Sequence, residues 1–238
     1  MKNRTFITVS LIVSALLFAV WSLLFGNEEA ERLWYAFLVN FLFFTSLAGG
    51  LAVWPAIVVS AYGNWMGNAE RFCRTGLSFS LPSVIALVIL WIGSDTWAPW
   101  IHHDKGMFWL NNGFLFIRNL AALIGFWIMA FLFVRQRYSK NRRTVARWFV
   151  LVYVIAFSLL GFDFVMALEP EWYSMMMGGY FFITAVYLAA AAWAFMAVIS
   201  GETNREVLHD LGKLVIAFCM FSAYLMFSQL LPIWYANN

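Results

Sequence analysis

Residues 33–61 form an uncharged stretch, LWYAFLVNFLFFTSLAGGLAVWPAIVVSA, that decides the fold class. About 20 consecutive apolar residues are enough for one helix to cross the hydrocarbon core of a bilayer, and this stretch is longer than that. Within a bilayer, only helices and closed barrels satisfy their own backbone hydrogen bonds. A single apolar run of this length therefore predicts a membrane-spanning helix.

Six further apolar runs accompany this one along the chain. Together they predict one all-α domain over residues 1–238, a polytopic transmembrane bundle of about seven spans. The predicted spans are Thr5–Phe25, Leu33–Ala61, Leu77–Gly93, Phe108–Val134, Trp148–Leu168, Met176–Ile199 and Leu208–Tyr235. We expect the first run to be a retained helix rather than a signal peptide, because its apolar core is long and no A-x-A cleavage site follows it.

The composition excludes other classes of protein. The chain is 63% hydrophobic and 11% charged, whereas a soluble domain has about 25% charged residues. Disordered chains have low hydrophobicity, so disorder is excluded as well. Only two cysteines are present, Cys73 and Cys219, which are too few for a zinc or iron–sulfur cluster. The net charge of +3 is too small to indicate nucleic-acid binding.

Basic residues predict how the chain is oriented. Of the fifteen lysines and arginines, twelve fall on the side of the N-terminus, and only Arg32 and Lys105 fall on the other side. The remaining one, Arg118, lies inside a span. Because cytoplasmic loops carry the excess of lysine and arginine, the N-terminus is predicted to be cytoplasmic. With an odd number of spans, the C-terminus is then periplasmic.

Two charged residues, Arg118 and Asp163, lie within predicted spans. A charge there costs roughly 2.5–3.5 kcal/mol on insertion scales, so it needs a reason. Arg118 is about 15 Å from the outer end of its span and Asp163 about 9 Å, a difference that an arginine can close by reaching outward. One interpretation is a protonatable Asp163 in a proton or quinol path, with Arg118 tuning its pKa. The other is a structural ion pair.

A second polar group, His209, Asp210 and Lys213, opens the last span at the cytoplasmic side. One interpretation is a proton entrance or a headgroup site. The other is a polar start of the helix, in which the negative charge of Asp210 is stabilised near the positive N-terminal end of the helix dipole. Tyr180 belongs to a set of neutral polar residues within the spans. Such residues either join helices by hydrogen bonds or line a pocket for a quinone head.

Small residues and prolines predict details of the packing. The Gly49-Gly50 pair and the alanines at 189–192 allow close approach of helices. Pro55 and Pro82 are expected to kink the spans that contain them.

Metal, haem and retinal sites are not predicted. The adjacent His102 and His103 cannot face one ligand on a helix, and no histidine lies inside a span as a haem ligand would. A retinal protein needs a lysine in the middle of its seventh span, but Lys213 is at the edge. We expect no metal and no cofactor bound by this chain alone.

Several short motifs occur from the second predicted span onward. They are FLVNFLFF at 37–44, Leu110-Asn111 through Phe116-Ile117-Arg118, DFVMALEPEWYS at 163–174, GYFF at 179–182, HDLGK at 209–213, AYLMFSQ at 223–229 and IWYAN at 233–237. This combination resembles the NrfD/PsrC-like quinone-interacting membrane subunits. Most closely, it resembles the ActF subunit of alternative complex III, the bacterial quinol:cytochrome c oxidoreductase.

The resemblance implies a location, partners and a substrate. It implies a bacterial inner-membrane subunit beside a homologous membrane subunit, under a periplasmic iron–sulfur protein and multihaem cytochrome c subunits that carry the iron–sulfur and haem groups. Menaquinol or ubiquinol would be the substrate. Arg118, Asp163, His209, Asp210 and Lys213 become members of the family's motifs.

The sequence also departs from the family pattern. Ala167 replaces the usual serine, and Glu171 replaces the usual histidine, so a proton role of that histidine does not transfer. Family members continue beyond IWYAN into roughly three more helices. A separate chain supplying those helices, a reduced variant or a truncated sequence would each explain the difference.

The leading hypothesis is a membrane subunit of a quinol-oxidising respiratory complex that provides a proton path or a quinol-facing surface. Asp163 would carry protons outward, Arg118 would hold its charge state, and His209, Asp210 and Lys213 would form the cytoplasmic entrance. One alternative is a structural membrane anchor without quinone or proton chemistry. Others are a subunit of another NrfD/PsrC-type oxidoreductase and a secondary transporter, although no internal repeat is visible.

Overall fold

The computed structural model describes residues 30–102, 108–136, 139–170, 172–201 and 204–236. Helices make up most of this part, which contains no strand, so the predicted all-α bundle is confirmed. The first predicted span, Thr5–Phe25, lies outside it. Six described helical segments are long and apolar enough to cross a membrane, and they coincide with the other six predicted runs. They are Ala30–Ser60, Glu70–Ile92, Asn112–Arg135, Arg142–Leu168, Met177–Ser200 and Arg205–Tyr235.

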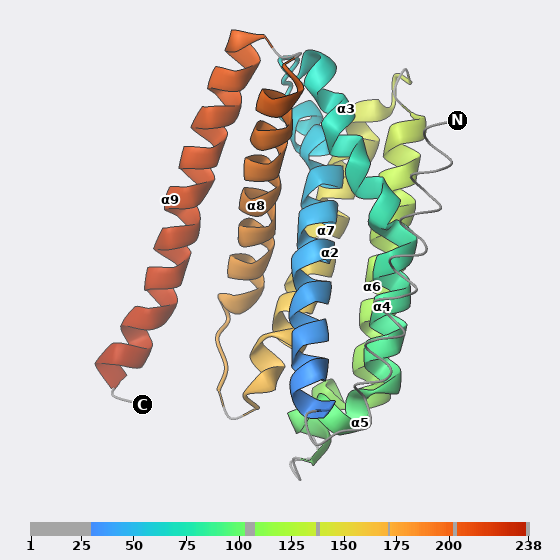
Figure 1. Cartoon of the computed structure of the whole chain (residues 1–238), viewed down its shortest axis with the longest axis vertical. Coiled ribbons are helices and arrows are strands. Elements are labelled where there is room, and N and C mark those ends of the chain that lie inside the picture. The colour runs from blue at the N-terminus through green and yellow to red at the C-terminus, as the bar shows by residue number, and fades with distance from the viewer. Residues whose placement is uncertain (1–29, 103–107, 137–138, 171, 202–203, 237–238) are drawn as a thin grey trace.

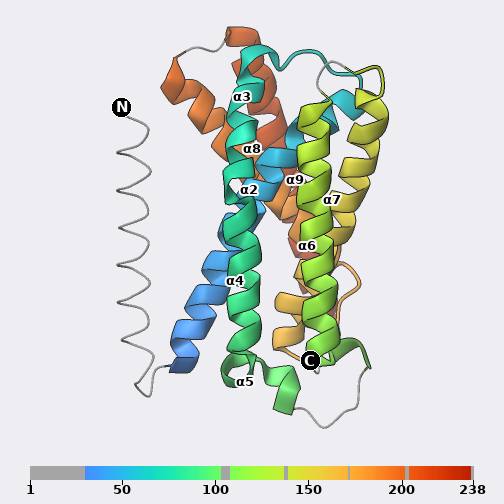
Figure 2. The ribbon, with the colours of Figure 1, turned by 90° about the vertical axis from the view of Figure 1, so that its right-hand side faces the viewer.

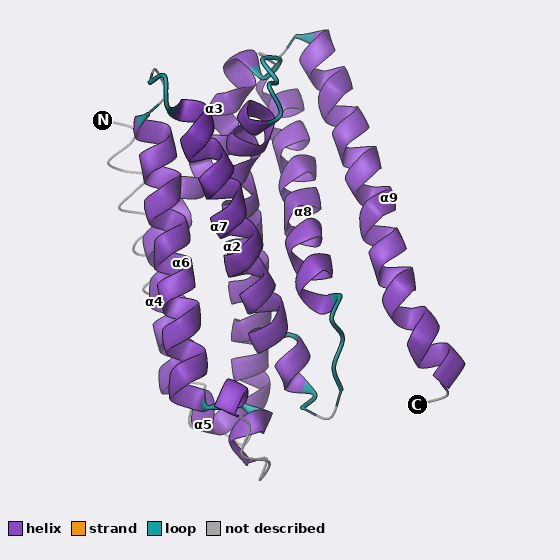
Figure 3. Ribbon diagram, turned by 180° about the vertical axis from the view of Figure 1, so that it is seen from behind, coloured by secondary structure: helices purple, strands orange, loops and turns teal. Residues whose placement is uncertain are grey.

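Helix α2 (Ala30–Ser60) forms the centre of the bundle. It packs against α7 (Arg142–Phe164) and α8 (Met177–Ser200), and α7 packs in turn against α6 (Asn112–Arg135). Helix α4 (Ser80–Ile92) lies beside α6. Helix α9 (Arg205–Ala236) packs mainly on α8 and stands at the edge of the bundle, as Figures 1 and 3 show.

Short helices close the two ends of the bundle (Figure 2). We call one the α5 end, after α5 (Ser94–Trp97), and the other the α3 end, after α3 (Glu70–Cys73). The connection between α6 and α7 lies at the α3 end and carries Lys140, Arg142 and Arg143. Arg32, at the start of α2, lies at the α5 end. The described basic residues outside the spans are thus segregated as the topology prediction requires, while the membrane side of each end stays a prediction.

The third predicted span is not one straight helix. It belongs to a longer segment, Glu70–Ile92, which consists of α3, the 3-10 helix η2 (Arg74–Phe79) and α4, so Pro82 lies in the first turn of α4. A proline is tolerated there because the first amides of a helix have no partner within it. The α-helical geometry is thus broken before Pro82, where the 3-10 helix η2 precedes α4, and the expected kink at Pro82 itself stays a prediction. Helix α2, in contrast, continues through Pro55.

Small residues bring α2 and α8 close together, as predicted. A methyl group added to Gly50 would lie 2.6 Å from the Ala185 carbonyl oxygen and 2.6 Å from Cβ of Ala189. The neighbouring Gly49 receives the ring of Phe157 from α7. In a membrane, helices gain little from the hydrophobic effect between them, so such close contact supplies much of their association.

Buried tryptophans join helices through their indole N–H groups. Trp54 of α2 donates to the Val186 carbonyl at 3.0 Å, and Trp127 of α6 donates to Ser83 Oγ of α4 at 2.8 Å. Trp34, Trp97 and Trp100, which lie at or beyond the periplasmic ends of predicted spans and are expected at the membrane interface, lie at the α5 end and face the core, where each is at most 4% exposed. An indole ring suits the core side of this region as well as its lipid-facing side, so the assignment to the interface stays a prediction.

We expect Gly50→Ala to lower the stability of the bundle. The new methyl group meets backbone and Cβ atoms of α8, and overpacking of this kind costs about 1–3 kcal/mol. Thermal unfolding of the purified protein in detergent measures the effect. The matched control is Gly125→Ala in α6, where an added methyl group meets no other atom within 4 Å. Equal unfolding temperatures for both variants would contradict the close approach of α2 to α8 at Gly50.

Candidate functional site

The candidate site is centred on Asp163 at the α5 end of the bundle. Asp163 is the penultimate residue of α7, and its side chain is fully buried. Arg118 reaches it from α6, donating from Nε to Oδ2 at 3.0 Å and from Nη2 to the same oxygen at 2.6 Å. Both interpretations of these two residues required that they meet, and the structure brings them together as an ion pair.

Two further side chains complete the coordination of the carboxylate. Asn119 of α6 donates from Nδ2 to Oδ2 at 2.5 Å. Trp109, in the 3-10 helix η4 (Phe108–Leu110), donates from its indole nitrogen to Oδ1 at 3.2 Å. Both oxygens of Asp163 therefore accept hydrogen bonds, and the buried negative charge is compensated by one cation and two neutral donors.

Aromatic rings hold the guanidinium of Arg118. Its Cζ atom lies 3.8 Å from the centre of the Trp109 ring and 4.8 Å from that of Phe114. Such cation–π contacts are worth about 2 kcal/mol when they are shielded from water, and the Arg118 side chain is only 11% exposed. The arginine thus has a second stabilising environment beside its ion pair.

The site lies nearer the helix ends than the sequence predicted. Helix α6 begins at Asn112 rather than Phe108, because the Asn111 side chain caps it by accepting from the Phe114 amide at 3.1 Å. Arg118 is then only about 9 Å from the start of its helix, at 1.5 Å per residue. Its Nη2 lies 3.5 Å from the carbonyl oxygen of Trp109, nine residues earlier, so it does reach toward the end of the bundle.

Two buried polar atoms of the site have no hydrogen-bond partner among the described residues. They are Nη1 of Arg118, a donor, and Oδ1 of Asn119, an acceptor. Buried polar groups are normally hydrogen-bonded. This donor and this acceptor are therefore available to a water molecule or to a polar group of a ligand.

The other predicted site residues do not join this cluster. His209, Asp210 and Lys213 lie in the first turns of α9 at the α3 end, where Lys213 Nζ pairs with Asp210 Oδ1 at 3.1 Å on an exposed surface. Tyr180 lies in the first turn of α8 at the α5 end, half-buried. Since α8 continues for twenty residues beyond Tyr180, about 30 Å separate the two groups. The four residues therefore do not form one site.

Sequence reasoning missed the roles of Asn119 and Trp109. Asn119 follows Arg118 directly, and a polar residue beside an intramembrane charge is a signal that could have linked it to the site. The position of Trp109 depends on the fold of a short 3-10 helix, which no sequence pattern indicated.

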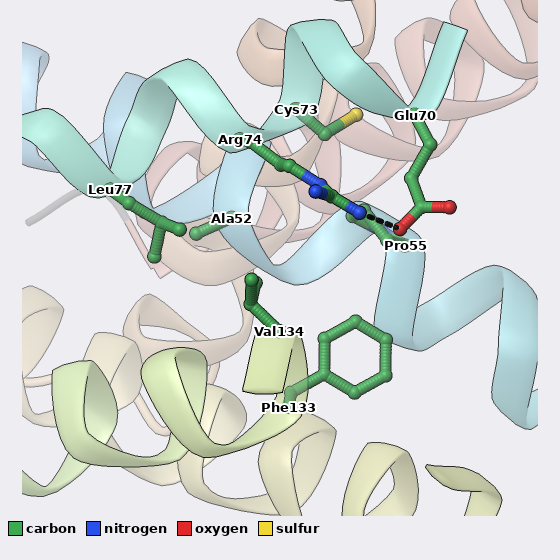
Figure 4. A pocket seen from close by; sticks show the side chains of 8 residues that line it. All are labelled: Ala52, Pro55, Glu70, Cys73, Arg74, Leu77, Phe133 and Val134. Carbon is green, nitrogen blue, oxygen red and sulfur yellow. Dashed lines mark hydrogen bonds and ion pairs between the residues drawn. The ribbon is translucent and has the colours of Figure 1, made fainter. Parts of the chain in front are cut away.

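A second charge cluster, which is partly buried, lies at the α3 end. Glu70 Oε1 accepts from Arg74 Nη2 at 3.3 Å and from Arg142 Nη2 at 3.0 Å, and so links α3 to the start of α7. Sequence reasoning counted both arginines only toward the topology. Figure 4 shows Arg74 pointing at Glu70 beside a cavity of about 10 Å3, the scale of one water molecule. The cavity is lined by Ala52, Pro55, Glu70, Cys73, Arg74, Leu77, Phe133 and Val134.

The remaining sequence expectations concern cysteines and metals. Cys73 is buried, Cys219 is exposed, and both are free. Within the described ranges, no group of three or more histidine, cysteine or acidic side chains is placed to hold a metal ion. The His102-His103 pair lies outside the part whose side chains the structure describes.

Comparison with models of known protein families finds no match, and comparison with curated proteins finds no matching sequence either.

Removing Arg118 alone should destabilise the protein more than removing the whole ion pair. We expect Arg118→Met to cost about 3 kcal/mol or more, because it leaves the buried Asp163 carboxylate without its cation. The double variant Arg118→Met with Asp163→Leu should recover most of this loss. Thermal unfolding in detergent measures both.

The exposed pair offers a control for this comparison. Lys213→Met should change stability by less than about 1 kcal/mol, because exposed ion pairs contribute little. If Arg118→Met lowered the stability no more than Lys213→Met does, the large contribution to stability assigned to the buried pair would be wrong.

Proposed function

We propose that this chain is a membrane subunit of a quinol-oxidising respiratory complex of the alternative complex III type, in the bacterial inner membrane with its N-terminus in the cytoplasm. One observation carries the proposal, namely the buried Asp163 held by Arg118 in a bundle of apolar helices. An ionisable residue inside a membrane span is a candidate for a proton path. The motifs that contain both residues add support.

Asp163 is the proposed proton carrier. Oxidation of a quinol releases two protons and two electrons, and iron–sulfur and haem groups on partner subunits would take the electrons. The Asp163 carboxylate would accept a proton when Arg118 moves away from it, and would release that proton when the ion pair forms again. The rings of Trp109 and Phe114 beside the guanidinium support this exchange, because they stabilise the arginine cation apart from the carboxylate.

The two ends of the bundle would lie on opposite sides of the membrane and have different roles. His209, Asp210 and Lys213 at the α3 end would form the cytoplasmic polar entrance, where their exposure favours contact with water. Tyr180 shares the α5 end with Asp163 and is the candidate to face a menaquinol or ubiquinol head. The unpartnered Nη1 of Arg118 and Oδ1 of Asn119 suit a polar quinol group or a relaying water.

Helix α9 supports a role within a larger assembly. Large apolar side chains on it are exposed, among them Ile216, Met220, Tyr224 and Phe227, each more than 60% exposed. We propose that a homologous membrane subunit, or a separate chain that supplies the further helices, covers part of this surface. A periplasmic iron–sulfur protein and multihaem cytochrome c subunits would then dock at the α5 end.

A structural anchor is the second candidate function. The observation that favours it is that Asp163 receives four hydrogen bonds and is fully buried, so its carboxylate has no contact with solvent. On this interpretation, the ion pair only fastens α6 to α7, and the chain holds its partners together.

The variant Asp163→Asn tests the first function against the second. It keeps the size of the side chain but removes its ability to carry a proton. We expect quinol-dependent cytochrome c reduction by the assembled complex to fall by roughly 100-fold, a typical effect of losing a proton-transferring group. Proton release per quinol should be measured in the same preparation.

Complex assembly must be measured alongside turnover. The matched control is Glu31→Gln, which removes an exposed carboxylate at the same end of the bundle. Wild-type turnover and proton stoichiometry in a fully assembled Asp163→Asn complex would contradict the proton role. Loss of assembly with normal turnover per assembled complex would favour the anchor.

A further inference from the structure

A cavity of about 280 Å3 opens at the α3 end of the bundle, apart from the Asp163 site. One wall is the end of α2 and the turn that follows it, and the other is the connection between α6 and α7 with the first residues of α7. Its lining residues are Val59, Tyr62, Gly63, Asn64, Ser139, Lys140, Arg142 and Arg143. Apart from Val59 and Gly63, every lining residue carries a polar or charged side chain.

The charge of this cavity is positive. Lys140, Arg142 and Arg143 line it, and Arg142 is the one that pairs with Glu70 at 3.0 Å. In the part of the chain that is described, no carboxylate lies within ion-pair distance of Lys140 or Arg143. Nε of Arg142 is also buried without a partner there. The cavity thus offers two uncompensated cations and one further N–H donor.

Tyr62 fixes one wall of the cavity. It is the one described residue other than glycine with a positive φ, at 62°, a conformation that bulky side chains rarely adopt. Its ring lies 3.9 Å from Cζ of Arg143, and its hydroxyl accepts from Arg147 Nη2 at 3.3 Å. The positive φ belongs to the C-cap of α2, in which the Gly63 amide donates to the Val58 carbonyl at 2.8 Å and the Tyr62 amide to the Val59 carbonyl at 3.3 Å. This turn places the Tyr62 ring and hydroxyl beside two arginines at the cavity.

We propose that this cavity binds a phosphate group, supplied by the headgroup of an anionic phospholipid. Arginine and lysine donors around a polar cavity match the oxygens of a phosphodiester. The cavity lies where α2 ends and α7 begins, and both helices are long enough to cross a membrane. With the proposed orientation, on which this inference rests, that place is at the level of the cytoplasmic headgroups, and basic pockets between spans on that side bind lipid headgroups. Free phosphate shares this chemistry, so the experiment must separate the two sources. The proposal does not depend on the Asp163 chemistry.

The test uses the full chain in its native complex, purified in neutral detergent. The complex is titrated with phosphatidylglycerol or with phosphatidylcholine, and bound lipids are counted by native mass spectrometry. We expect one tight phosphatidylglycerol site and no matching phosphatidylcholine site. Each basic residue near a membrane surface contributes about fivefold in affinity, so the double variant Lys140→Gln with Arg143→Gln should weaken the site by roughly 25-fold.

The matched control is the double variant Arg135→Gln with Arg205→Gln. It removes two exposed cations from the same end but not from the cavity. Unchanged tight binding in this control, with loss in the cavity variant, supports the proposal. Equal weakening in both variants would overturn it, because only the general surface charge would then matter.

Inorganic phosphate added as a competitor distinguishes the two sources. Phosphatidylglycerol that stays bound at millimolar phosphate supports the lipid headgroup as the ligand. Displacement of the lipid by micromolar phosphate would overturn that assignment and identify a soluble phosphate site. A cavity variant that binds as much phosphatidylglycerol as the unmodified chain would overturn the proposal in either form.

Discussion

The carboxylate of Asp163 must be satisfied in a place that water does not reach, and this requirement organises one end of the molecule. Its four hydrogen bonds come from Arg118, Asn119 and Trp109. Two of these residues lie on α6, and the third lies on the short helix that precedes it. The ends of α6 and α7 and the segment leading into α6 are therefore fixed together by one charged group. A proton transfer at Asp163 that displaces Arg118 would therefore also loosen the contact between α6 and α7.

The rest of the bundle is held by contacts of a different kind. Gly50 lets α2 lie directly on α8, and indole N–H groups of Trp54 and Trp127 join neighbouring helices. Between apolar helices in lipid, close packing and hydrogen bonds replace the hydrophobic effect as the source of cohesion. Part of the chain's high content of aromatic residues thus lies inside the bundle, where rings pack together and indole N–H groups donate hydrogen bonds between helices.

The sequence predicted the features that depend on long stretches and missed those that depend on local turns. Apolar length located six spans, and depth within a span identified Arg118 and Asp163. The break before Pro82 and the start of α6 at Asn112 follow from 3-10 helices and a single capping asparagine, which average composition does not reveal. Trp109 and Asn119 joined the site only through three-dimensional proximity. Tyr180 and His209 share no site, since the antiparallel course of α8 and α9 places them at opposite ends.

The ion pairs at the two ends of α7, one buried and one partly buried, have an electrical consequence. Arg142, paired with Glu70, opens this helix, and Asp163, paired with Arg118, nearly closes it, about 31 Å away along the axis at 1.5 Å per residue. That length matches the insulating layer of a bilayer, about 30 Å thick. The Arg118–Asp163 pair is close to electroneutral and experiences little net force from a transmembrane voltage, whereas Glu70 is shared by two arginines, so that cluster keeps a positive charge. A proton passed from one end to the other would instead cross nearly the whole potential, at about 2.3 kcal/mol for every 100 mV.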